Sequence, residues 1–148
     1  MKSKKRSAAS SKPKPPETPT LFLDRSLGKK TVAEALRNAV AKVEVHDDHF
    51  ASDAQDETWL TAVGGRGWVV LTKDERIRFR TTEREALMNA KVRTFVLTAW
   101  NMDGATMAQV LVKALPKITK MSSTQPAPFI ATVSKIGSTT ILSSKLRK

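Results

Sequence analysis

Apolar and polar residues follow two different spacings along this chain, and the spacings alternate from one segment to the next. Short apolar runs predict strands at residues 20–23, 43–46, 68–72 and 92–97. Apolar residues at helical spacing predict helices at about 31–40 and 56–63, from 82 onward, and at about 104–120. Residues 129–133 and 139–142, joined across Gly137, predict a hairpin.

Local signals predict where two of these helices begin and end. Thr31 and Glu34 have the spacing of a capping box at the start of the first helix. Gly64, Gly65 and Gly67 are predicted to end the second helix and turn the chain.

The order of elements predicts the fold class. Strands that alternate with helices form a three-layer α/β/α domain around a mainly parallel sheet. The continuous apolar run 68–72 is typical of a central parallel strand, which is buried on both faces. We therefore expect an α/β domain whose sites lie beyond the carboxyl ends of the strands.

Length and composition predict one domain with basic ends. The chain has 148 residues, enough for a single domain with a core, and 40% of them are hydrophobic. We expect a disordered basic arm at residues 1–19, the domain at 20–143, and a basic tail at 144–148. Cysteine is absent, which excludes disulfides and cysteine-ligated metals and fits a reducing compartment, and we expect a cytoplasmic protein. The sequence has no apolar run of about 18 residues, so we expect no membrane span.

The charge of the chain indicates a polyanionic partner. The formal net charge is +12. Six basic residues and one acidic residue lie before residue 19, so +5 of this charge belongs to the arm and the remainder to the domain. The arm either adds nonspecific affinity for phosphates or is a solvated tail without a specific role.

Three acidic residues are predicted to meet at one edge of the sheet. Asp24 and Asp74 follow two of the strands, and Asp56 opens a helix between them. Asp56 precedes Trp59 by three residues and Leu60 by four, so it shares their apolar face and is expected to point toward the sheet. Neighbouring carboxylates suit Mg²⁺ or Mn²⁺, which can activate water for displacement at phosphorus. Each acid alone has a simpler explanation as a turn or cap residue.

Basic residues follow the third strand directly. Lys73 is adjacent to Asp74, and Arg76 and Arg78 alternate with apolar residues, so in an extended segment the two arginines share one side. We expect these three side chains to bind the phosphates of a nucleic acid. The alternative is a solvated loop whose charges favour solubility.

At these residues the chain resembles the PIN-like domain proteins, relatives of the VapC-type toxin ribonucleases. The matching segments are Leu21-Phe22-Leu23-Asp24, Val45-His46-Asp47-Asp48, Asp56-Glu57-Thr58-Trp59-Leu60 and the stretch from Val69 to Arg76. The resemblance implies an endoribonuclease that uses Mg²⁺ or Mn²⁺ and hydrolyses RNA through a metal-activated water. It also implies the toxin of a toxin–antitoxin pair, a cognate antitoxin as partner and a homodimer. By motif, Asp24, Asp56 and Asp74 would be the catalytic metal ligands.

Two positions depart from the pattern of the family. Arg25 and Arg76 stand where related sequences often carry acids. The site either holds one ion instead of two or takes a further ligand from Asp47, Asp48 or Glu57. The departures also leave open a PIN-like domain of weakened catalysis that binds nucleic acid or protein. A third hypothesis, phosphotransfer on a strand-end aspartate, fits the basic charge poorly.

Overall fold

The fold is an α/β/α sandwich, known from a computed structural model that describes residues 18–28, 30–73, 81–98 and 102–144. The predicted arm up to residue 17 and the tail from residue 145 lie outside the described residues, as do Asp74, Arg76 and Arg78. The elements follow in the order β1 (Thr20–Leu23), η1 (Arg25–Leu27), α1 (Thr31–Asn38), β2 (Lys42–Val45), η2 (His46–Asp48), α2 (Asp56–Gly65), β3 (Val69–Thr72), α4 (Thr81–Ala90), β4 (Arg93–Leu97), α5 (Gly104–Thr124), β5 (Phe129–Val133) and β6 (Thr139–Ser144).

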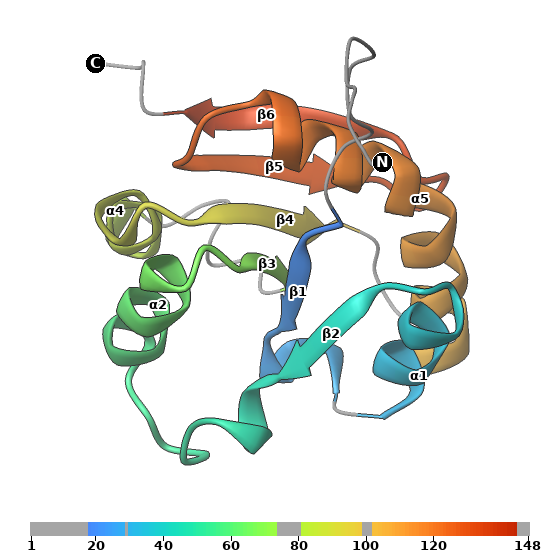
Figure 1. The fold of residues 1–148 in the computed structure, drawn as a ribbon, viewed down its shortest axis with the longest axis horizontal. Helices are drawn as coiled ribbons and strands as arrows, with labels where there is room; N and C mark the ends of the chain where they lie inside the picture. The colour runs from blue at the N-terminus through green and yellow to red at the C-terminus, as the bar shows by residue number, and fades with distance from the viewer. Residues whose placement is uncertain (1–17, 29, 74–80, 99–101, 145–148) are drawn as a thin grey trace, which may run out of the picture.

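The six strands form one sheet in the order β2-β1-β3-β4-β5-β6. The pairs from β2 through β5 are parallel, and β6 is antiparallel to β5. Figure 1 shows α1 and α5 on one side of the sheet and α2 and α4 on the other. The predicted three-layer fold with a mainly parallel sheet and a terminal hairpin is confirmed.

Side chains of the central strands point alternately to the two faces of the sheet and pack in two separate hydrophobic cores. In β1, Leu21 and Leu23 pack in the core of α1 and α5, whereas Phe22 packs in the core of α2 and α4. Because successive strand residues point to opposite faces, a strand covered on both sides must be apolar throughout. All four residues of β3 are buried, as the continuous apolar run predicted. No helix of the described residues is long and apolar enough to cross a membrane.

Three helices end in turns of the same handedness. Val40, Gly67 and Lys91 follow α1, α2 and α4 with φ angles of 70°, 73° and 59°. Each turn redirects the chain into the next parallel strand. After α1, the Val40 amide donates to Arg37 O at 2.9 Å and the next amide donates to Leu36 O at 3.0 Å, which is a Schellman motif.

Of the two predictions about helix ends, the capping box at Thr31 is wrong and the glycine-rich end of the second helix is confirmed. Thr31 is the first residue of α1, and its N-cap residue, Lys30, makes no side-chain capping bond. α2 ends at Gly65, and Gly67 follows with a φ angle of 73°, so this glycine-rich segment ends the helix and turns the chain as predicted. A Cβ atom at Gly64 would contact the backbone carbonyl of Ala90, so this glycine permits a close approach of α2 to α4.

Candidate active site

Asp24 lies at the carboxyl end of β1, where a parallel sheet places its sites. Its amide donates to Leu71 O at 3.0 Å, so the chain remains paired with β3 up to this residue. Asp24 is also the N-cap of η1, and its Oδ1 accepts from the Arg25 amide at 2.7 Å. Asp24 therefore does act as a helix cap, but the cap uses only one of its two carboxylate oxygens.

Two hydroxyl groups hold the other oxygen of Asp24. Thr72 Oγ1 donates to Oδ2 at 2.6 Å, and Ser26 Oγ donates to the same oxygen at 2.9 Å. The Lys73 amide donates to Ser26 Oγ at 3.0 Å, which leaves the serine proton for the carboxylate. We name Asp24, Ser26 and Thr72 the hydroxyl cradle. Hydroxyl groups from η1 and β3 therefore fix the direction of the Asp24 carboxylate.

Sequence reasoning missed both hydroxyl residues of the cradle. Thr72 was visible only as the last residue of an apolar run, and Ser26 as part of a loop. The signal that could have found them is a hydroxyl residue shortly after the first strand and another at the end of the third, because β1 and β3 pair in register.

The structure describes only part of the predicted ligand set. Asp56 is the first residue of α2, as predicted, but its side chain lies outside the described part. Asp48 and Glu57 are exposed. Among the described side chains, no three acids or histidines lie close enough together to hold a metal ion. The inward direction of Asp56 and its meeting with Asp24 and Asp74 stay predictions.

The described donors fit a hard divalent ion. A carboxylate flanked by hydroxyl oxygens is the oxygen-rich chemistry that Mg²⁺ and Mn²⁺ prefer. Asp24 Oδ1 accepts one hydrogen bond and keeps lone-pair capacity for a ligand bond. In the sequence, the predicted ligand Asp74 follows Thr72 by two residues.

Arg25, one of the two residues expected to depart from the family pattern, is paired with an acid that follows the neighbouring strand β2. Its Nε lies 3.3 Å from Asp47 Oδ1, and its Nη1 donates to Ser52 O at 3.1 Å. His46 Nδ1 lies 3.2 Å from the same Asp47 oxygen. His49 Nε2 contacts Glu44 Oε1 at 2.7 Å, so the two histidines have different partners.

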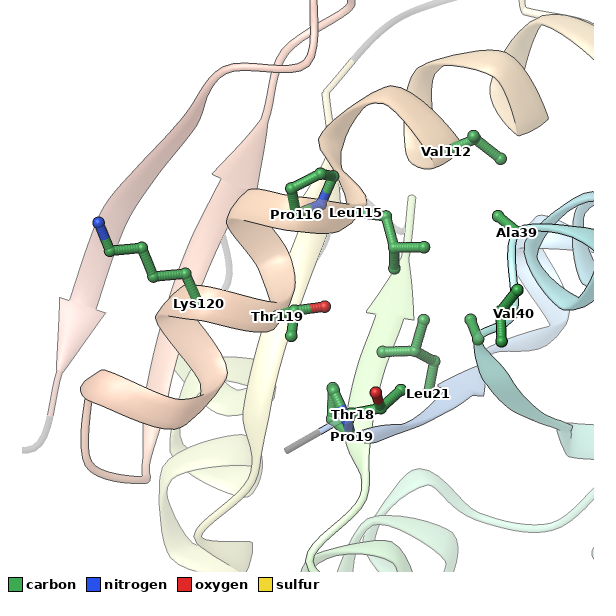
Figure 2. A pocket seen from close by; sticks show the side chains of 11 residues that line it. Thr18, Pro19, Leu21, Ala39, Val40, Val112, Leu115, Pro116, Thr119 and Lys120 are labelled. Carbon is green, nitrogen blue, oxygen red and sulfur yellow. The ribbon is translucent and has the colours of Figure 1, made fainter. Parts of the chain in front are cut away.

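One cavity lies at the carboxyl end of β1, and another lies at its amino end. A cavity of about 280 Å³ is lined by Arg25, Gly28, His46 and Asp47. An apolar groove of about 500 Å³ lies at the other end, where the chain enters β1, between α5 and the turn after α1 (Figure 2). None of the described residues that line the groove is acidic, and the groove lies at the opposite end of β1 from the cradle.

Comparisons with known proteins agree with the predicted fold. Residues 19–99, more than half of the chain, match the family described as PIN like domain. A protein of Mycobacterium tuberculosis (strain ATCC 25618 / H37Rv), named "Putative ribonuclease VapC45", is 28% identical over 117 residues, which cover 76% of this chain and 84% of that protein. No solved structure gives a significant match. The chain therefore belongs to the PIN-like domain family.

Proposed function

We propose that this protein is an endoribonuclease that depends on Mg²⁺ or Mn²⁺ and acts as the toxin of a toxin–antitoxin pair. The observation that carries the proposal is the hydroxyl cradle, which aims a carboxylate at the carboxyl edge of a parallel sheet in a strongly basic protein. The similarity to a protein named as a ribonuclease supports the same reaction.

In this proposal Asp24, Asp56 and Asp74 hold the metal and act as the catalytic residues. A divalent ion bound there supplies Lewis acidity, which activates water and offsets charge at phosphorus. Ser26 and Thr72 are proposed as positioning residues, because their hydroxyl groups contact the Asp24 carboxylate. Fixed carboxylates need no rearrangement when the ion and the phosphate arrive.

Lys73, Arg76 and Arg78 are proposed to bind the RNA backbone next to the metal. Lys73 follows β3 directly, and its side chain is half-buried. Binding through phosphates predicts that affinity falls as salt rises.

The proposed partners follow from the toxin role. The protein would act in the cytoplasm on RNA, would be inhibited by a cognate antitoxin, and would form a homodimer.

The test compares wild-type protein with Asp24→Asn and with the control Asp53→Asn, an exposed acid in the turn before α2. Each protein is incubated with a mixed RNA pool in Mn²⁺ and in EDTA. We expect cleavage in Mn²⁺ only, unchanged in Asp53→Asn, and lowered about a hundredfold in Asp24→Asn because a metal ligand has lost its charge.

A wild-type protein that binds RNA without cleaving it would contradict the proposal. Equal RNA affinity of wild type and Asp24→Asn would then support the alternative, a PIN-like binding module. The ion pair of Arg25 with Asp47 is the specific observation in favour of that alternative, since it holds a cation at one of the two positions expected to depart from the family pattern.

A further inference from the structure

The positive charge of the chain is concentrated outside the segment that carries the predicted metal ligands. Residues 19–103 contain 13 basic and 13 acidic residues, so their formal net charge is zero. Residues 104–148 contain seven basic residues and no acidic residue. Apart from the amino-terminal arm, the whole net charge therefore belongs to the last part of the chain, which begins with α5. A basic region without acids is the electrostatic footprint of a surface that binds a polyanion.

Helix α5 arranges three of these charges on one of its flanks. Lys113, Lys117 and Lys120 are exposed and follow one another at spacings of four and three residues. At about 100° per residue, the three side chains lie within about 60° of one another around the helix axis. Leu111 and Ile118 lie on a different side of α5 and are buried in the core. We name the three lysines the lysine stripe.

The turn between β5 and β6 extends the lysine stripe toward the carboxyl edge of the sheet. A Cβ atom at Gly137 would lie 3.4 Å from Lys113 Cγ, so the turn packs against the middle of α5. Lys135 belongs to the same turn and is exposed. Because β1, β3, β4 and β5 are parallel, the turn after β5 lies at the same edge of the sheet as Asp24. The charges therefore begin at the edge with the candidate active site.

The other end of the lysine stripe lies near the opposite edge. Lys120 borders the apolar groove at the amino end of β1, and Figure 2 shows its side chain pointing away from that groove. Seven residues separate Lys113 from Lys120, which is about 10 Å along the helix. The stripe thus leads along α5, away from the edge that carries Asp24.

The four lysines are available to bind an anion. Within the described part of the chain, no carboxylate pairs with the ammonium groups of Lys113, Lys117, Lys120 or Lys135. A lysine ammonium is a point charge on a flexible stem, which suits contacts to successive phosphates better than the reading of base edges. The surface therefore fits the backbone of a nucleic acid.

We propose that the lysine stripe and Lys135 form a second RNA-binding surface, separate from the basic segment that follows β3. The inference deepens the proposed function and rests on its claim that this protein binds RNA. An RNA strand at the candidate active site continues over the turn between β5 and β6 and along α5. Contacts there are made to phosphates, so they add affinity without preference for base sequence.

The first test measures binding in EDTA, where metal-dependent cleavage is prevented. The probe is a fluorescent single-stranded RNA of about 16 nucleotides, and anisotropy is recorded over a range of salt concentrations. Wild type is compared with the double variant Lys113→Gln/Lys117→Gln. The control Lys42→Gln/Lys91→Gln removes the same charge from two exposed lysines, at the start of β2 and after α4. Sedimentation with phosphatidylserine vesicles is measured for the same three proteins.

We expect Lys113→Gln/Lys117→Gln to weaken RNA binding about tenfold at low salt and to lower the salt slope by about 1.4, since each phosphate contact on a single strand contributes about 0.7. The control is expected to stay within about twofold of wild type, because its lysines lie away from the proposed path of the strand.

The absence of cysteine permits a second test, of the position of the surface. A photo-activated cross-linker is attached at Gln109→Cys, an exposed position one helical turn before Lys113, and at the control Asn89→Cys, an exposed position on α4. Both changes replace a side-chain amide and leave every lysine in place. We expect about fivefold more RNA to be cross-linked from Gln109→Cys, because the lysine stripe holds the strand against α5.

Three results would overturn the surface. Equal losses of RNA affinity in the two lysine variants would show that only the total charge matters. Unchanged RNA affinity of Lys113→Gln/Lys117→Gln, together with weaker vesicle sedimentation, would assign the lysine stripe to anionic lipid instead. Equal cross-linking from the two cysteine positions would show that the strand does not follow α5.

These outcomes are separable from those for the proposed function. If wild type does not cleave RNA in Mn²⁺ and the binding differences appear, the nuclease proposal fails and the RNA-binding surface stands. If wild type cleaves and the binding differences are absent, the surface fails and the nuclease proposal stands.

Discussion

Replacing Thr72 with Val tests whether the hydroxyl cradle holds Asp24. Valine has the shape of threonine, so the variant removes the hydroxyl from a fully buried position without opening a cavity. The lost bond is 2.6 Å long and ends on a carboxylate. Hydrogen bonds to charged groups contribute about 1.5–3 kcal/mol, and Ser26 still donates to the same oxygen, so we expect a loss of about 2 kcal/mol.

The assay is urea unfolding in EDTA, with the free energy of unfolding compared in a double-mutant cycle. In the Asp24→Ala background the same Thr72→Val change should cost less than about 1 kcal/mol of unfolding free energy, because the Asp24 acceptor is gone. Thr72→Ser is the matched control, since it keeps the hydroxyl and removes a methyl group.

If Thr72→Val lowers the free energy of unfolding equally in both backgrounds, the Thr72 hydroxyl does not act through Asp24. A further consequence concerns the proposed metal. Mn²⁺ affinity of Thr72→Val should fall about tenfold, because residues that orient a ligand affect metal affinity on that scale.

Three further predictions concern stability. Val40 is 85% exposed, is β-branched and has a φ of 70°, so Val40→Gly should raise the free energy of unfolding by about 1 kcal/mol, measured by urea unfolding; a loss would contradict the assigned conformation. Gly64→Ala should destabilise by about 2 kcal/mol because its Cβ meets the carbonyl at the end of α4, whereas Gly65→Ala, with open space around it, should stabilise by about 0.5 kcal/mol; equal melting temperatures would refute the close approach. Hydrogen bonds from the Thr106 amide lower the pKa of Asp103, so the stability that this N-cap contributes is complete above the unfolded pKa and is lost as pH falls through the folded pKa. As the pH is lowered below about 4, the melting temperature should therefore fall more for wild type than for Asp103→Asn. Parallel plots of melting temperature against pH for the two proteins would show that the cap bond is absent.

The sequence by itself determined the order of elements and the layer architecture. Strand and helix periods are local properties, and a run such as 68–72 can bury both faces only inside a parallel sheet. The same locality placed Asp24 at a strand end, because the residue after an apolar run marks the edge of the sheet. The family resemblance rested on these same residues and was confirmed.

Tertiary structure decided what each side chain touches. Ser26 and Thr72 meet at Asp24 although 46 residues separate them, because β1 and β3 are neighbours in the sheet. Arg25 pairs with Asp47 only because β1 and β2 end side by side. The sequence predicted Gly64 as part of a helix end, and only the structure shows that its lack of a side chain also permits the contact between α2 and α4. Contacts between distant residues depend on strand order and helix approach, and neither is encoded in the period of a single segment.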